Sequence, residues 1–335
     1  MKKRVVLFSV FLLLGIGLFV GVILQTGLGE MWRKLREFSL LHFFVFLGLS
    51  FLNFGLYTLR WHLIVKALHD KTINFGKLFL HRMSGFGLSY LTPSAQTGGE
   101  PLRILLLHHE GVSTRTATSS VVIDKGLELG ALFLFIALGI VIALFDGSLP
   151  AELHVIMLVS LVGMFSLMFW VIFATIKRIG FFSSILRFFR LTKFKKVKSF
   201  EEKVIEVEEE IAHFYKKHVG TFWILVPISL VITSFLLLEH YLVARFMGVH
   251  MTFLQTFLVS TIPYVAFVIP IPGGLGILEG GHAAIFLALG ISINAFVLVF
   301  IIRIRDLCFV LIGLRHASKQ GLSMLRQAFQ EGKKG

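Results

Sequence analysis

The chain is poor in the residues that mark soluble, disulfide-bonded or metal-binding proteins. Its 335 residues include one cysteine, seven prolines and only 16% charged side chains, whereas an ordinary soluble domain carries about 25%. The single Cys308 lies in an apolar segment, which excludes a disulfide framework and a cysteine-based metal site. No Walker loop, dinucleotide-binding fingerprint or Ser-His-Asp order occurs. We therefore expect no cofactor, no metal and no enzyme of those classes.

What the chain has instead is long apolar sequence. Hydrophobic residues make up 56% of it, 36 of them are phenylalanine, and the mean hydropathy is +0.84. The runs are long and do not alternate, whereas the strands of an outer-membrane barrel alternate over about ten residues. The composition therefore predicts an all-α integral membrane protein.

The net charge of +14 is concentrated in segments between apolar runs. Positive-inside bias and contact with anionic lipid headgroups explain this pattern better than nucleic-acid binding does. We expect a multi-pass protein of the cell (inner) membrane with both termini cytoplasmic. Its expected partners are membrane lipids, with no nucleic acid.

Six apolar runs are long enough to cross a bilayer, which takes about 20 residues of helix. They are 5–28, 40–59, 118–145, 155–176, 222–246 and 295–314. Two shorter segments, 75–107 and 252–290, are interrupted by glycine and proline. The charge of the flanking loops requires each short segment to enter and leave by the same face. We therefore predict two re-entrant hairpins, one from each side.

The second hairpin contains a helix-breaking run, 270–281, with the sequence PIPGGLGILEGG. Irregular backbone at membrane depth persists only where it is buried in protein or lines a polar cavity. An offset of 179 residues relates this run to the first hairpin through four identities, which are Pro93/Pro272, Glu100/Glu279, Gly111/Gly290 and Ser113/Ser292. The pattern predicts an inverted repeat, with one copy at about 1–150 and the other at about 151–320. Such repeats, with helices broken near the midplane, are typical of transporters.

A basic insertion at about 177–220 separates the two predicted repeats. Within it, Val204, Val207, Ile211 and Phe214 recur at helical spacing between charged residues. This spacing predicts a cytoplasmic amphipathic helix. The basic stretch 177–198 is also a candidate docking site for an enzyme of envelope-lipid synthesis.

Several motifs together resemble the flippase-like membrane domain of lysylphosphatidylglycerol synthases. They are Gly-Gly-Glu-Pro-Leu-Arg at 98–103, Gly111, Asp124-Lys125, Pro-Gly-Gly-Leu-Gly at 272–276, Glu279, and the segment from Arg303 to Asp306. The resemblance covers nearly the whole chain and implies movement of an aminoacylated lipid between leaflets. Little sequence follows the last predicted span, so we expect a stand-alone relative without the soluble synthase domain. Relatives often carry Glu-Arg where this chain has Asp124-Lys125, and that change would remove any bidentate arginine contact.

The candidate substrate-binding residues lie in the hairpin breaks and in the spans that follow them. They are Glu100, Arg103, Asp124, Lys125, Glu128, Pro272, Gly273, Gly274, Glu279, Arg303, Arg305 and Asp306. The two glutamates at the breaks either bind a cationic headgroup or coupling ion, or cap freed backbone amides. The basic residues either contact lipid phosphate or pair internally, with the acidic residues of the spans as counter-charges.

Other polar residues have simpler interpretations. We interpret Arg60 and Arg82 as interfacial anchors rather than ligands. His108-His109-Glu110 lacks a third metal ligand at suitable spacing, because adjacent helical histidines point apart. Glu239-His240, inside a span, is either a polar helix contact or a proton relay.

These observations favour a lipid translocase for a phospholipid or lipid-linked sugar, facilitated or ion-coupled because no ATP-binding motif occurs. Two alternatives stay open. One is a membrane-embedded enzyme acting on a lipid phosphate, with Glu100 or Asp124 as base. The other is a non-transporting accessory subunit that docks a synthesis enzyme through 177–198.

Overall fold

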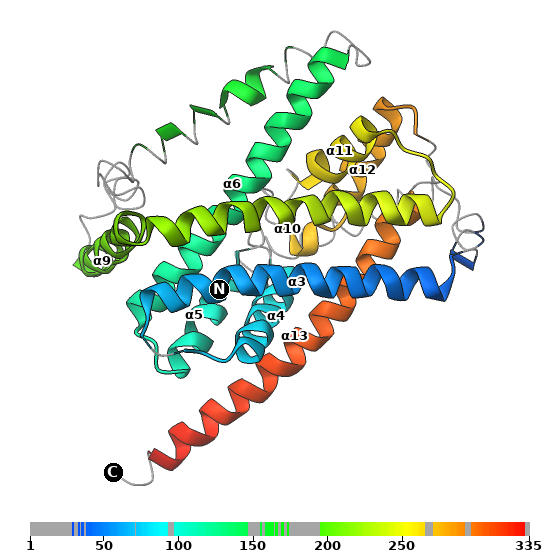
Figure 1. The fold of residues 1–335 in the computed structure, drawn as a ribbon. Helices are drawn as coiled ribbons and strands as arrows, with labels where there is room; N and C mark the ends of the chain where they lie inside the picture. The colour runs from blue at the N-terminus through cyan, green and yellow to red at the C-terminus, as the bar shows by residue number, and fades with distance from the viewer. Residues whose placement is uncertain are drawn as a thin grey trace. The chain divides into compact units, whose positions relative to one another are not determined.

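The computed structural model describes residues 38–70, 72–92, 97–146, 195–264, 271–291 and 296–331, with isolated positions in 29–36 and 155–173. Every regular element in these residues is helical (Figure 1), which confirms an all-α protein. The predicted spans at 5–28 and 155–176 lie outside the continuously described residues. The prediction of six spans therefore stays a prediction.

Three described helices are long and apolar enough to cross a membrane by length and composition. They are α3 (Leu40–Leu68), α6 (Thr114–Asp146) and α10 (Val219–Phe246). Each coincides with a predicted span, so the chain is a membrane protein with several apolar helices. The sequence predicts that the first of these spans ends at Leu59, because the charged Arg60 follows. The helix continues to Leu68 because Arg60 is buried and paired rather than solvated.

The last predicted span is the first part of α13 (Phe296–Glu331). This 36-residue helix is long enough to cross a bilayer, but it is not among the three apolar helices. Its apolar sequence is interrupted by Arg303, Arg305 and Asp306, and the structure pairs all three of these residues with other groups.

The two segments predicted to be hairpins each contain two short described helices, and their re-entrant course stays a prediction. The first consists of α4 (Phe75–Leu91) and α5 (Glu100–His109). The second consists of α11 (Phe253–Thr261) and α12 (Ile277–Ala288), with the short 3-10 helix η3 (Pro272–Gly274) in the break. A rise of 1.5 Å per residue gives lengths of about 26, 15, 14 and 18 Å for the four α-helices, each shorter than a hydrocarbon core of about 30 Å.

The two short helices α5 and α12 end in matching turns. Gly111 and Gly290 both have positive φ, at 92° and 64°. Gly111 N donates to His108 O over 2.9 Å, and Gly290 N donates to Leu287 O over 3.2 Å. All four residues correspond at the 179-residue offset. Glycine is needed at both positions because a side chain would strain a left-handed backbone.

The chain divides into two compact units. The first unit takes the described residues of Met1–Gly55, Gly76–Leu106 and Ser234–Gly335, and the second takes those of Leu56–Phe75 and Leu107–Thr233. Each unit contains sequence from both predicted repeats. The units therefore differ from the two halves that the sequence offset defines.

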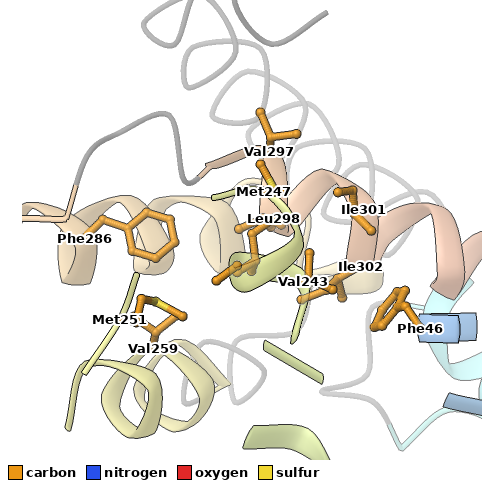
Figure 2. Close-up of a cluster of buried hydrophobic side chains, with 12 residues drawn as sticks. Phe46, Val243, Met247, Met251, Val259, Phe286, Val297, Leu298, Ile301 and Ile302 are labelled. Atoms are coloured by element: carbon orange, nitrogen blue, oxygen red, sulfur yellow. The ribbon is translucent and has the colours of Figure 1, made fainter. Parts of the chain in front are cut away.

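The core of the first unit gathers apolar side chains from five helices (Figure 2). Its buried members include Phe46 of α3, Val259 of α11, Phe286 of α12, and residues from the end of α10 and the start of α13. α4 and α13 also meet without intervening side chains, because a Cβ on Gly313 would overlap the carbonyl group of Met83. Small residues permit this kind of close backbone approach between membrane helices.

The second unit contains the predicted amphipathic helix, α9 (Lys195–Lys217). α9 packs against α6, and its Phe214 is fully buried in a cluster with Ile64, Ile123 and Leu225. The prediction of the helix and of its apolar face is confirmed. Glu210 of α9 accepts hydrogen bonds from hydroxyl groups on α6, at 2.9 Å from Thr116 and 3.1 Å from Ser119.

Candidate functional site

The second break owes its shape to proline and glycine. Gly273, Gly274 and Gly276 have φ angles of 58°, 60° and 77°, which L-residues with side chains rarely adopt. α12 then begins at Ile277. The bare Cα of Gly273 also lies against the ring of Tyr90, where a Cβ would come within 2.9 Å of Cε1. The break is therefore packed against the end of α4.

Glu279 lies in the first turn of α12 and is fully buried. Its Oε2 accepts a hydrogen bond from Gly276 N at 2.7 Å, and its Oε1 accepts one from Arg303 Nε at 2.6 Å. Both carboxylate oxygens are thus engaged. The structure realises the capping interpretation of this residue and adds an ion pair, since a carboxylate at a helix start also interacts favourably with the helix dipole.

Arg303 of α13 connects the second break to the end of α4. Its Nη1 donates to Tyr90 Oη at 2.8 Å and to Gly273 O at 2.7 Å. Its Nη2 lies 3.4 Å from Gly274 O. Only arginine offers such a planar fork of donors. One buried guanidinium therefore holds α4, the second break and the start of α12 together.

Arg305, two residues further along α13, makes a second set of contacts. It donates to Glu239 Oε2 of α10 at 2.6 Å, to Asp306 Oδ1 at 2.9 Å and to Ser50 Oγ of α3 at 3.3 Å. Glu239, Glu279, Arg303, Arg305 and Asp306 are called the α13 charge cluster below. All five side chains are at most 11% exposed.

The first break is built differently. Glu100 starts α5, and its Oε2 accepts a 2.8 Å hydrogen bond from Arg103 one turn later, as their i,i+3 spacing predicts. Gly99 N donates to Ser89 Oγ of α4 at 2.8 Å. A Cβ on Gly85 would meet the aliphatic part of Arg103 at 2.6 Å. Gly99 and Arg103 therefore both contact α4.

The second unit holds a separate buried ion pair. Arg60 Nε donates to Asp124 Oδ1 at 2.8 Å, and both side chains are completely buried. Arg60 also contacts Ser229 Oγ at 3.2 Å and Glu128 Oε2 at 3.6 Å. Glu128 accepts a second, shorter bond of 2.7 Å from Lys125. Asp124, Lys125 and Glu128 thus form one network on α6 and α3.

The interpretation of Arg60 as an interfacial anchor was wrong, because its side chain has no exposed surface. Arg82 is also buried, at 7% exposure. Nothing in the local sequence around Tyr90 indicates its role, apart from its position as the last aromatic residue before a break. For Glu239, a polar helix contact is one of the two interpretations given above, and its partner on α13 lies 66 residues away, where no local pattern indicates it.

The site residues predicted from sequence fall into three groups. Pro272, Gly273, Gly274, Glu279, Arg303, Arg305 and Asp306 belong to the second break and the α13 charge cluster, all in the first unit. Glu100 and Arg103 form their own pair in that unit, and Asp124, Lys125 and Glu128 lie in the second unit. Among the described residues, no group of three or more histidine, cysteine or acidic side chains is arranged to hold a metal.

Comparison with known proteins identifies related membrane proteins. Residues 6–313 match the family model described as lysylphosphatidylglycerol synthase TM region. A UPF0104 membrane protein of Methanothermobacter thermautotrophicus is 26% identical over 301 residues, covering 85% of this chain and 86% of the relative. A UPF0104 membrane protein of Pyrococcus horikoshii is 26% identical over 257 residues, covering 71% and 74%. No solved structure matches the chain. The chain belongs to the lysylphosphatidylglycerol synthase transmembrane-region family.

Proposed function

We propose that the chain is a lipid translocase that moves the headgroup of a phospholipid or lipid-linked sugar between leaflets. The proposed site lies between two re-entrant hairpins, α4–α5 and α11–α12. In a cell membrane, both termini would face the cytoplasm and the hairpins would enter from opposite sides. The short lengths of α5, α11 and α12 support the hairpins, because none of these helices alone reaches across a bilayer.

The observation that carries this proposal is the position of Arg303. Its guanidinium binds Tyr90 at the edge of the first break and the carbonyl oxygens of Gly273 and Gly274 in the second. A guanidinium is also the best bidentate partner for a phosphate group. A lipid phosphate can therefore compete with Glu279 for Arg303. That exchange would release the contacts that hold the two breaks together.

The matching turns at Gly111 and Gly290 support descent from a duplication. In each copy a break is followed by a short helix, a left-handed glycine and a long helix, which is α6 in one case and α13 in the other. In transporters with inverted repeats, broken helices place their ends near a midplane substrate site. The repeat thus supports alternating access as the mechanism.

The direct test uses purified full-length protein in vesicles that contain short-chain fluorescent phosphatidylglycerol. Albumin added outside extracts only lipid exposed in the outer leaflet. With active protein, the inner-leaflet lipid should also become extractable, at a rate set by translocation. Equal extraction with and without protein would overturn the proposal. Extracted lipid that is chemically altered would instead favour the membrane-enzyme alternative.

Two variants connect the assay to the site. Arg303→Lys keeps the charge but loses the planar fork, so translocation should fall by about tenfold or more, the effect of losing at least 1.4 kcal/mol of binding. Arg315→Lys is the matched control, because Arg315 lies on the same helix and is exposed. The double variant Glu100→Gln with Glu279→Gln should also be impaired. Full activity in this double variant would remove the carboxylates from the mechanism.

The accessory-subunit alternative makes the opposite prediction. In that case, neutralising the basic residues of 177–198 should abolish function in cells. The two break carboxylates should then be dispensable, whereas translocation by the mechanism proposed above uses them.

A further inference from the structure

Two buried histidines lie beside the α13 charge cluster, and no contact described above uses them. His240 of α10 follows Glu239, and His282 of α12 follows Glu279 by one helical turn. Their rings are stacked, with centroids 5.9 Å apart and planes 4° apart. His240 has no exposed surface and His282 is 1% exposed.

The hydrogen bonds of this pair define where a proton can be added. His240 Nδ1 lies 2.8 Å from Leu236 O, and His282 Nδ1 lies 2.8 Å from Leu278 O. A carbonyl oxygen only accepts, so each Nδ1 carries a hydrogen. Each neutral ring therefore presents a basic Nε2 lone pair. Among the described residues, neither Nε2 atom has a hydrogen-bond partner, and a buried acceptor without a partner is unfavourable.

The α13 charge cluster beside the pair has a formal net charge of −1. It contains three carboxylates and two guanidiniums, and both histidines are neutral in the form described above. Burial opposes a proton on either ring, and so do Arg305 at His240 and Arg303 at His282, so the net negative charge of the cluster is what a proton there would balance. Tyr264 faces His240 from the turn after α11 at 6.0 Å between ring centroids. α11 itself carries no titratable side chain.

We propose that His240 and His282 form a binding site for one proton, which is bound together with the anionic lipid headgroup. An aqueous proton adds to one Nε2 lone pair and leaves from the same atom, so no other bond forms or breaks. The bound proton brings the cluster to neutrality. It also offsets the further negative charge that a phosphate introduces at Arg303. By linkage, proton and phosphate then strengthen each other's binding.

The coupling between proton and headgroup rests on the proposed translocation, whereas proton binding by the two histidines does not. Proton binding is measured directly by nitrogen-15 NMR of histidine-labelled full-length protein in lipid nanodiscs. The chain has 13 histidines, so the pair is assigned by comparison with His240→Asn and His282→Asn. Asparagine keeps an N–H donor for the backbone carbonyl but has no titratable nitrogen. His250→Asn is the control, because His250 is exposed.

The titration runs from about pH 8 to about pH 4, which extends below the range in which histidines ordinarily titrate because burial opposes the proton, and one Nε2 of the pair should become protonated within it. If both rings stay neutral throughout, the proton site is overturned. Should a variant fail to fold, its histidine is assigned in the wild-type protein instead, because Glu-His and Gly-His each occur once in the chain, at 239–240 and 281–282.

The coupling is measured as translocation of fluorescent phosphatidylglycerol at about pH 5.5 and about pH 7.5, on either side of the ordinary histidine pKa. The wild type should be faster at the lower pH by about fivefold or more, the lower end of ordinary coupling between sites. The double asparagine variant should translocate equally at both values. A pH-independent wild type overturns the coupling. Absence of any translocation overturns the proposed function instead, and the NMR titration still decides the proton site.

Discussion

Glu279 Oε1 and Arg303 Nε lie 2.6 Å apart, with both side chains buried and the two residues 24 positions apart in the sequence. Removing one partner of such a pair leaves a buried, uncompensated charge, which typically costs about 3–5 kcal/mol. Replacing both partners with neutral residues of similar volume is often close to neutral for stability. The pair therefore permits stability and function to be separated.

We predict that Glu279→Ala lowers the thermal stability of the detergent-solubilised protein far more than the double variant Glu279→Gln with Arg303→Met. The double variant should regain most of the lost stability but should not translocate lipid, since it lacks the guanidinium. Thermal unfolding and the vesicle assay measure the two properties. Glu209→Ala, at an exposed position on α9, is the control. A single variant that is as stable as this control would contradict the prediction.

The pair of Arg60 and Asp124 in the second unit gives a prediction of a different kind. Arg60→Met should lower the melting temperature strongly, because it leaves the fully buried Asp124 without its 2.8 Å partner. Adding Asp124→Asn should restore much of it, because the buried charge is then gone. The comparison is a double-mutant cycle on thermal stability. Additive losses in the double variant would show that the ion pair contributes no coupling.

Arg60 also shows where sequence reasoning reached its limit. The apolar runs predicted α3, α6 and α10 because membrane helices need long stretches of hydrophobic side chains. Proline and glycine predicted the breaks because they disfavour continuous helix. The partner of a buried charge depends instead on tertiary packing. Arg60 and Asp124 are 64 residues apart, so the sequence near Arg60 does not show that its charge is paired. An unpaired charge would end the membrane helix, and the predicted end at Leu59 was therefore too early.

The second break also combines residues that the sequence indicates with one that it does not. Its glycines and Glu279 were recognised from the sequence, because glycine-rich backbone beside a carboxylate is unusual in apolar surroundings. Tyr90 was not recognised, although it packs on Gly273 and binds Arg303. An aromatic residue at the end of an apolar helix carries no local signal of such a role. Only the arrangement of α4 against α13 reveals it.

The close approach of α4 and α13 predicts a sharp difference between two glycines of one helix. Gly313→Ala would place a Cβ into the carbonyl group of Met83, so the helices must separate. Overpacking of this kind typically costs about 1–3 kcal/mol. Gly321→Ala has open space around the new Cβ and should be neutral or stabilising, by up to about 1 kcal/mol. Equal melting temperatures for the two variants would contradict the close packing.

The contact of α9 with α6 gives the last prediction. Glu210 accepts hydrogen bonds from Thr116 and Ser119, and hydrogen bonds to a charged group are worth about 1.5–3 kcal/mol. Its ion pair with Arg115 at 3.2 Å adds little, because the arginine is 44% exposed and solvent screens such pairs.

Glu210→Ala should therefore speed amide hydrogen exchange in 204–214 by about tenfold or more, since 1.4 kcal/mol corresponds to a factor of ten. Phe214 stays buried against Ile64 and Leu225, so α9 should loosen without unfolding the rest of the second unit. Glu209→Ala changes the same charge on the same helix at an exposed position and should leave exchange unchanged. If both variants exchange alike, Glu210 does not anchor α9, and the apolar face alone attaches it to α6.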